Sequence, residues 1–215
     1  MTDINTGQQV LNIIKETANR AGPAVVIRVS NPATAYLRPV ATRPDCLNHE
    51  DVELLTRWRN NHPRAFLTEF TATTDRTEKW LSNTVHHDSG RILFMVEDST
   101  GDTIGYMGLA YIDWDRRYGE ADAVVRGKPA PGGLMKQSLL TLLDWARHGL
   151  GLEEIGVRVL SDNPAIEFYK KCGFVETKRI ALSSRRQDGE VSWYENSDNA
   201  TPERSLVYHT LDNRD

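Results

Sequence analysis

The stretch that decides the fold of this chain is SDNPAIEFYKKCGF, residues 161–174. Asn163 suits the cap of a helix and Pro164 suits its first turn. Four side chains recur at helical spacing and share one face: Ala165, Phe168, Tyr169 and Cys172. Gly173 fits the left-handed position after the helix, and Phe174 begins a strand. Taken alone, the pattern is typical of a short amphipathic helix between two strands.

The sequence on either side alternates between strand and helix patterns. Strands are predicted over 35–40, 91–98, 103–113, 119–127, 153–160, 174–182 and 204–211. Helices are predicted over 48–61, 74–85, 134–149 and 163–172. Gly105 and Gly108 indicate a bulge in the third of these strands. The order predicts an α/β fold with a mixed, largely antiparallel central sheet and helices on both faces.

Composition excludes several classes of protein. The chain has 215 residues, 39% of them hydrophobic, and a net charge of −4, so a basic nucleic-acid binder is disfavoured. It lacks an apolar run of roughly 20 residues and a secretory leader, so we expect a cytoplasmic protein without a membrane partner. Neither Cys46 and Cys172 nor the histidines have metal-ligand spacing, so we expect no metal.

The first residues look like an appendage. Residues 1–33 are predicted to form an N-terminal extension, with one helix and a strand near AVVIRVS. Apolar and small side chains recur at helical spacing in that helix: Val10, Ile13, Ile14 and Thr17. Residues 34–215 are predicted to form the main domain.

The segment before residues 161–174 adds a second pattern. A strand ending in AVVRG, residues 123–127, is followed by the loop KPAPGG and a long helix. This layout, together with the later helix, resembles the GCN5-related N-acetyltransferase (GNAT) superfamily. The positions that carry the resemblance in the later helix are Asn163, Ala165, Ile166, Phe168, Tyr169, Gly173 and Phe174. The resemblance covers roughly residues 35–182 and implies the GNAT fold.

The resemblance implies acetyl-CoA as co-substrate. A glycine-rich loop before a helix exposes backbone N–H groups that favour a phosphate anion. The implied cofactor-binding residues are Val124, Val125, Arg126, Gly132, Gly133, Leu134, Met135, Asn163 and Phe168. The loop departs from the family pattern, because two prolines separate Arg126-Gly127 from Gly132-Gly133. Which amides hold the pyrophosphate is therefore open.

The resemblance also implies catalytic roles. Tyr169 corresponds to the acid that protonates the departing thiolate, and a tyrosine pKa near ~10 suits that task. Strand alternation places Glu120, Asp122 and Val124 on one face, so Glu120 and then Asp122 are the candidate bases, with Asp113 third. The alternatives are solvated carboxylates, partners of an arginine, or no dedicated base, since proximity alone supplies much of the rate.

The acceptor side carries a weaker resemblance. Trp58, Arg59, Asn60 and Trp80 resemble the branch that acetylates nucleotide-linked amino sugars and protein N-termini. Arg59 is the candidate for substrate binding; the alternative is pairing with a nearby glutamate. The two tryptophans suit the core.

Residues 183–204 form a long polar segment between two strands, and long loops tend to be functional. Trp193 and Tyr194 are candidates to stack on a base or sugar, with Arg185 and Arg186 meeting a diphosphate. The alternative is a solvated hairpin plugged by one aromatic residue.

The sequence thus predicts an acetyl-CoA-dependent N-acetyltransferase acting on a primary amine of a small molecule. An amino sugar on a nucleotide carrier is the first candidate. The alternatives are acetylation of a peptide or protein N-terminus, and a non-catalytic acyl-CoA-binding module, which only the altered loop favours. A homodimer formed through the first 33 residues also stays open.

Overall fold

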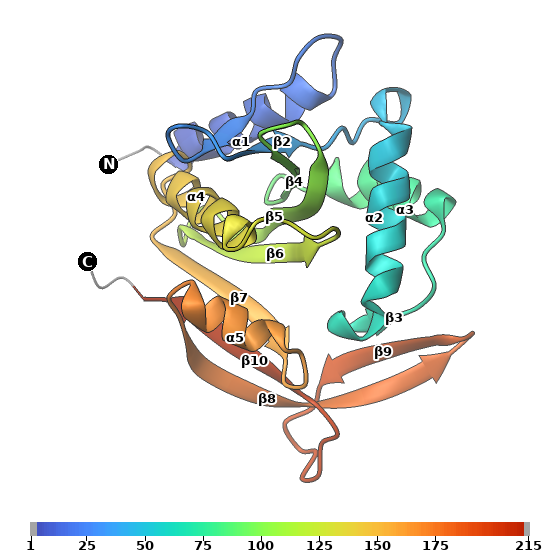
Figure 1. Cartoon of the computed structure of the whole chain (residues 1–215). Coiled ribbons are helices and arrows are strands. Elements are labelled where there is room, and N and C mark those ends of the chain that lie inside the picture. Colours follow the sequence, from blue (N-terminus) through green and yellow to red (C-terminus); the bar gives the residue numbers. More distant parts are fainter. Residues whose placement is uncertain (1–3, 213–215) are drawn as a thin grey trace.

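The computed structural model describes residues 4–212, and Figure 1 shows its helices and strands. The helices are α1 (Ile4–Ala18), α2 (His49–Asn61), α3 (Thr74–Trp80), α4 (Leu134–His148) and α5 (Ala165–Lys171). The strands are β1 (Ile27–Val29), β2 (Ala35–Pro39), β3 (Thr68–Glu69), β4 (Ile92–Asp98), β5 (Thr103–Asp113), β6 (Tyr118–Arg126), β7 (Glu154–Leu160), β8 (Phe174–Gln187), β9 (Glu190–Glu195) and β10 (Ser205–Leu211). A π-helical turn, η3 (Leu81–Val85), extends α3. No helix within residues 4–212 combines the length and apolarity needed to span a bilayer.

The strands of residues 4–212 form one ten-stranded sheet in the order β1-β2-β4-β5-β6-β7-β10-β8-β9-β3. Neighbouring strands are antiparallel at every junction except β6–β7, which is parallel. The predicted bulge in β5 is confirmed by a register shift between Tyr106 and Gly108. The mixed, largely antiparallel sheet predicted from the sequence is therefore confirmed.

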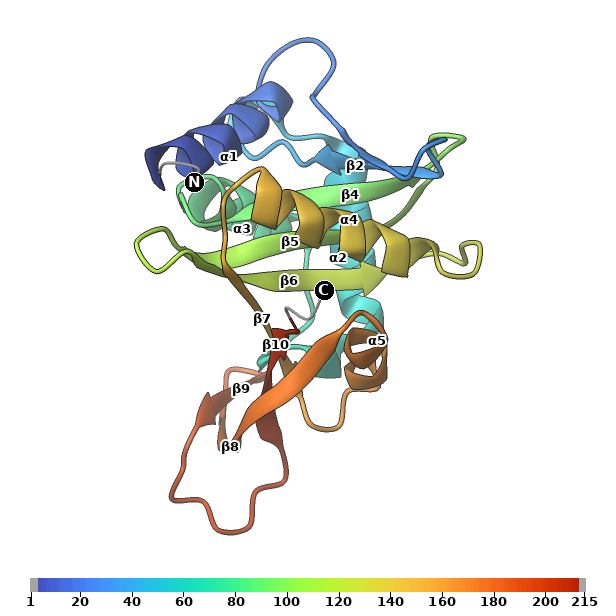
Figure 2. The ribbon, with the colours of Figure 1, turned by 90° about the vertical axis from the view of Figure 1, so that its left-hand side faces the viewer.

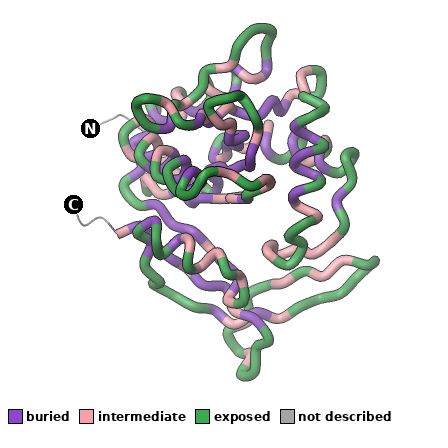
Figure 3. Tube along the Cα trace, viewed as in Figure 1, coloured by how far each residue is buried: buried purple, intermediate pink, exposed green. Residues whose placement is uncertain are grey.

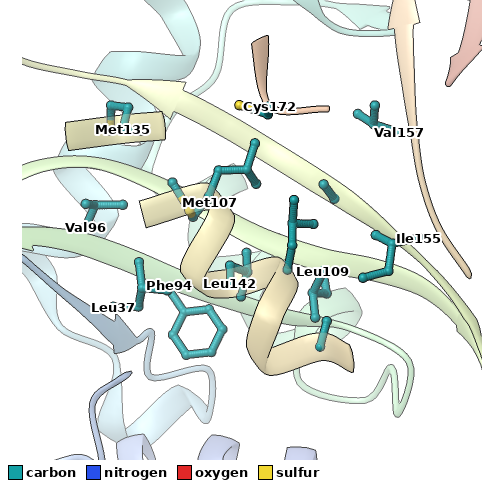
Figure 4. Close-up of a cluster of buried hydrophobic side chains, with 14 of the residues drawn as sticks. Leu37, Phe94, Val96, Met107, Leu109, Met135, Leu142, Ile155, Val157 and Cys172 are labelled. Atoms are coloured by element: carbon teal, nitrogen blue, oxygen red, sulfur yellow. The ribbon is translucent and has the colours of Figure 1, made fainter. Parts of the chain in front are cut away.

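Helices cover both faces of the sheet, as predicted (Figure 2). Strand β4 shows why its sequence is continuously apolar. Phe94 and Val96 pack in the cluster beneath α4, and Figure 4 shows Phe94 beside Leu142 of that helix. Leu93 and Met95 pack instead against α2 on the opposite face. Each side of β4 therefore buries its own set of side chains.

The N-terminal segment folds onto the same sheet. Leu11 of α1 is completely buried in the core cluster beneath α4. Strand β1 pairs with β2, so the predicted boundary between residues 33 and 34 falls inside this hairpin. Ile13, which we expected on the apolar face of the helix, is 59% exposed. The buried face of α1 runs instead through Gly7, Leu11 and Lys15.

The buried face of this helix includes a lysine, Lys15. The Lys15 ammonium donates to three carbonyl oxygens at the end of the α3–η3 helix: Val85 (2.7 Å), His86 (3.1 Å) and Asp88 (2.9 Å). Carbonyl groups at a helix C-terminus lack partners within the helix and attract a cation. The contact therefore joins residues 4–18 to the second layer of helices.

Strands β6 and β7 diverge after a short parallel pairing. Only three residue pairs join them, from Tyr118–Glu154 to Glu120–Gly156. Beyond that point the two strands separate, as Figure 1 shows. Residues 121–126 consequently have β5 on one side and no paired strand on the side of β7. This divergence creates an opening in the middle of the sheet.

Residues 183–195 of the polar segment form a β-hairpin, the alternative that the sequence left open, and residues 196–204 form the loop that follows it. Strand β8 continues to Gln187 and pairs with β9. Asp188 and Gly189 both adopt positive φ, the conformation of a tight hairpin turn that an Asp-Gly pair favours. That pair was the local signal for the turn. Figure 3 shows that the hairpin is largely exposed.

Candidate active site

A cavity of about 270 Å³ lies where β6 and β7 separate. It is lined by Leu55, Arg59, Ala65, Phe66, Thr77, Trp80, Tyr106, residues 121–125, residues 157–159, Asn163, Ala165 and Tyr169. The lining residues come from α2 and its following loop, from α3, from the central strands and from α5. The cavity therefore brings together most of the elements that the sequence singled out.

Tyr169, the candidate acid, lines the cavity from α5. Its ring packs edge-on against Phe168 and Phe174, with centroids 5.5 and 5.8 Å apart. The side chain is buried and lines the cavity, and no described residue makes a hydrogen bond to its hydroxyl. Burial raises the pKa of this phenol well above its ordinary value, and the nearby Asp122 carboxylate adds to the effect. A protonated, unpartnered hydroxyl therefore faces the cavity.

Asp122 also lines the cavity, at the point where β6 loses contact with β7. Arg91 donates to its Oδ2 atom at 2.7 Å. Among the described residues, none donates a hydrogen bond to the other oxygen, Oδ1. Asp122 thus keeps one acceptor atom for an amine or a water molecule.

Glu120, the first candidate base, is engaged elsewhere. Its Oε1 atom accepts a hydrogen bond from the Tyr118 hydroxyl at 2.8 Å, and its Oε2 atom accepts one from Arg158 at 2.7 Å. The residue is buried and does not line the cavity. The alternative interpretation, a carboxylate paired with an arginine, describes its structural position. Asp113, the third candidate, accepts from the backbone of Arg116 in the turn after β5.

The predicted alternation of β6 fails at Ala123. This residue has φ of +52°, a left-handed conformation that is uncommon for alanine. As a result, Ala121 and Val124 pack toward the cluster beneath α4, whereas Ala123 and Val125 pack toward α2. Ala121 and Val124 therefore lie on one face although they are three residues apart, so the regular alternation predicted from Glu120 to Val124 is broken. Strained backbone of this kind is common beside functional sites.

The loop before α4 retains the features of an anion site. Gly133 caps the helix with φ of +85°, and a Cβ atom at Gly132 or Gly133 would meet nothing within 4 Å. No backbone acceptor among the described residues binds the amides of Gly132, Gly133 or Met135. These amides at the start of a 15-residue helix suit the pyrophosphate of acetyl-CoA.

The first two residues of α4, Leu134 and Met135, were candidates for binding the cofactor. The Leu134 amide donates to the carbonyl oxygen of Pro131 at 3.2 Å, so it is already paired. The side chains of Leu134 and Met135 are buried in the core. Any contribution of these two residues to cofactor binding is thus restricted to the Met135 backbone.

The remaining cofactor candidates lie around the same opening. Asn163 lines the cavity, and its Oδ1 atom accepts from the Ala165 amide at 2.9 Å, which holds the start of α5. Val125 lines the cavity as well, while the exposed Arg126 borders a second hollow formed by residues 126–130. Phe168 supports the Tyr169 ring and does not line the cavity.

Arg59 lines the cavity from α2. Its guanidinium carbon lies 4.4 Å from the centre of the Phe66 ring and 3.8 Å from that of Phe70. It donates to the carbonyl oxygens of Thr68 (2.7 Å) and Phe70 (3.5 Å). The expected pairing with a glutamate does not occur.

Trp193 and Tyr194, the candidates for substrate binding on the hairpin, do not line the cavity. The Trp193 indole packs against a small cluster around Leu182 and donates to Glu69 at 2.8 Å. Tyr194 is 49% exposed on β9. The alternative of a solvated hairpin plugged by one aromatic residue describes this segment. The sequence offered no sign that Phe66 and Arg158 would line the site, because tertiary packing alone brings them there.

Comparison with known proteins agrees with this geometry. Residues 43–175, more than half of the chain, match the family model described as an acetyltransferase (GNAT) domain. A curated relative, spermidine N(1)-acetyltransferase of Vibrio cholerae, is 29% identical over 107 residues. That match covers 47% of this chain and 62% of the relative's length.

Solved structures share the fold. Spermidine N-acetyltransferase from Vibrio cholerae in complex with CoA and spermine aligns with a TM-score of 0.64 at 22% identity, covering 83% of this chain and 95% of that one. A structure of the Vibrio cholerae spermidine/spermine N-acetyltransferase with manganese ions aligns with a TM-score of 0.57, at 22% identity and over 83% and 92% of the two chains. In the part of this chain that the structure describes, no cluster of three or more His, Cys, Asp or Glu residues is arranged to hold a metal ion.

These findings confirm the GNAT superfamily, but they do not point to the amino-sugar branch expected from the sequence. The similar proteins named above are polyamine acetyltransferases rather than enzymes acting on amino sugars. The family match overlaps the whole cavity, from α2 to the end of α5. The chain therefore belongs to the GNAT family of acetyltransferases.

Proposed function

We propose that this protein transfers the acetyl group of acetyl-CoA to a primary amine of a small molecule. The observation that carries the proposal is Tyr169, a buried residue that lines the cavity and whose hydroxyl has no hydrogen-bond partner among the described residues. Family membership supports the same chemistry. The open amides before α4 fit the diphosphate of the co-substrate.

The proposed acetyl transfer needs one proton donor and one proton acceptor, and Tyr169 and Asp122 are the residues of the cavity that can supply them. The amine, once deprotonated, attacks the thioester carbonyl carbon, and a C–N bond forms as the C–S bond breaks. The Tyr169 hydroxyl gives its proton to the departing sulfur, and its phenolate regains a proton through water from the N–H that the nitrogen loses as the amide forms. The free Oδ1 atom of Asp122 accepts the amine proton directly or through water. Backbone N–H groups of residues 121–126 on the side where β6 no longer pairs with β7 would stabilise the oxyanion.

Three acceptor classes follow from the observations so far. Spermidine is the first to test, because the similar proteins are named as spermidine acetyltransferases. An amino sugar on a nucleotide carrier is the second, from the resemblance around Arg59. A peptide N-terminus is the third.

The first experiment is calorimetric titration of the protein with acetyl-CoA and with free CoA. Micromolar binding, about −8 kcal/mol, is expected if the loop before α4 holds the pyrophosphate. Thiol release is then measured with the three acceptor classes. Binding without thiol release from any amine would leave a non-catalytic acyl-CoA-binding module, and absence of binding at millimolar cofactor would overturn both.

A further inference from the structure

We infer that the acceptor carries an anionic group beside its amine, and that Arg59 receives this group. The inference rests on the proposed function and specifies the class of its acceptor. It comes from the charges around the cavity, which differ from those expected for a polyamine.

Arg59 is an unbalanced positive charge in the cavity. Its described hydrogen-bond acceptors are two backbone carbonyl oxygens, and no described carboxylate lies within ion-pair distance of it. Burial is the main cause that lowers the pKa of this guanidinium; Arg76 lowers it further, whereas Tyr106 and the Glu190 carboxylate raise it without forming an ion pair with Arg59. An incoming anion would offset that cost, since a half-buried charge gains most from a charged partner.

The Arg59 guanidinium is also held in place. Phe66 and Phe70 both contact its plane, and Arg76 lies 3.3 Å from the centre of the Phe70 ring. Arg76 is itself paired with Glu190. The guanidinium group is therefore oriented before any ligand binds, and several of its N–H groups have no acceptor among the described residues. This geometry suits a carboxylate or a phosphate.

The other charges that line the cavity are already neutralised. Asp122 is paired with Arg91, and Arg158 is paired with Glu120. With both pairs counted as neutral, Arg59 leaves the described lining with an excess of positive charge.

Nearby glutamates do not supply the missing negative charge. Glu69 accepts from Arg204 and Trp193, and Glu190 is bound to Arg76. Asp122 is therefore the one carboxylate, among the described residues, that lines the cavity. A polyamine that presents one amine for reaction keeps its other amines protonated near neutral pH. Those cations would meet Arg59 rather than a carboxylate, so the cavity disfavours them.

The position of Arg59 assigns it to the acceptor rather than to the cofactor. Arg59 belongs to α2, whereas the open amides before α4 lie on the opposite face of the sheet (Figure 2). Tyr169 lines the same cavity from α5. An amine placed at Tyr169 thus has its cofactor on one side of the opening and Arg59 on the other.

The test compares four primary amines in the thiol-release assay: spermidine, a neutral amino alcohol, an α-amino acid and a phosphorylated amino sugar. We expect at least one of the two anionic amines to have a kcat/KM at least 10-fold above that of spermidine. Arg59→Met should lower kcat/KM for that acceptor by roughly 10- to 100-fold, mainly through KM, since a hydrogen bond to a charged group is lost. Arg59→Lys should restore part of the loss.

Arg57→Met is the matched control, because Arg57 lies exposed on the same helix and does not line the cavity. It should change kcat/KM less than 2-fold. Acetyl-CoA affinity should be the same in all variants, which separates a lost acceptor contact from misfolding. Preference for spermidine with turnover intact would overturn the inference and leave the proposed function standing. Cofactor binding without acetylation of any amine would overturn both.

Discussion

Tyr169 and Glu120 illustrate how a side chain's neighbours decide its role. Both were candidates for proton transfer. The Tyr169 hydroxyl faces the cavity without a described partner, whereas both oxygens of Glu120 are bound. A carboxylate held by Arg158 and Tyr118 stabilises the junction of β6 and β7 and is not available to a substrate.

Replacing Tyr169 with phenylalanine tests its role as the acid. Tyr169→Phe should reduce kcat by roughly 10²- to 10⁴-fold, because the departing thiolate loses its proton donor. The dissociation constant for acetyl-CoA, measured by calorimetry, should change little. Tyr194→Phe removes an exposed hydroxyl outside the cavity and should leave kcat unchanged. An equal rate in both variants would assign Tyr169 to the core alone.

The pH dependence of kcat gives a second test. An acid must be protonated to act, and burial raises the pKa of Tyr169 above its ordinary value of 10.0. The acid form therefore persists to higher pH than in a free tyrosine. At saturating substrates, kcat should not decline between about pH 8 and 10, the range in which a tyrosine of ordinary pKa begins to lose its proton. A decline in that range that vanishes in Tyr169→Phe would contradict the raised pKa and would still identify Tyr169 as the titrating acid.

At the scale of elements, two backbone irregularities shape the site. The positive φ of Ala123 changes the side-chain alternation of β6, so Ala121 and Val124 pack on one face and Ala123 and Val125 on the other. Gly173, with φ of +93°, ends α5 and turns the chain directly into β8. Together they fix how the Tyr169 helix faces the opening in the sheet.

Gly173→Ala should destabilise the protein by about 1–2 kcal/mol. A Cβ atom there would lie 3.6 Å from Leu211, an ordinary contact, so the cost comes from the left-handed backbone rather than from a clash. Denaturant unfolding measures the change. Gly132→Ala is the control, because its φ is not in the left-handed region and its Cβ would meet no atom within 4 Å. Equal stability of the two variants would contradict the argument.

At the scale of the molecule, the two sides of the opening are joined twice. Strands β6 and β7 pair at one end, and β3, from the loop after α2, pairs with β9 at the other. Arg204 strengthens the second junction, since it donates to Glu69 (2.8 Å) and Asp162 (3.0 Å) while only 1% exposed. The C-terminal hairpin therefore supports the site without lining it.

Arg204→Met should destabilise the protein by roughly 2–3 kcal/mol. The value is below the 3–5 kcal/mol for breaking a fully buried pair, because the Asp162 side chain is 40% exposed. Arg64→Met removes an exposed partner of the same Asp162 and should cost less than about 1 kcal/mol. Thermal unfolding of both variants distinguishes them, and equal costs would refute a structural role for Arg204.

The sequence predicted most of the fold because its signals are local. Apolar runs, helix caps and glycines report the conformation of their own neighbours, and these gave the central strands and α5. Two features of the fold were not predicted, one with a local sequence signal and one without. The Asp188-Gly189 pair is a local signal for the hairpin turn, whereas no sequence pattern indicates the left-handed backbone conformation of Ala123.

The amino-acid sequence by itself determined the α/β class, the position of the Tyr169 helix and the family of the chain. The tertiary structure alone decided that Glu120 is paired, that Trp193 and Tyr194 lie outside the cavity, and that Arg59 faces it without a described carboxylate. The physical reason is that helix and strand patterns depend on residues close in sequence. The charge and burial of a side chain depend on partners that the fold brings from distant segments.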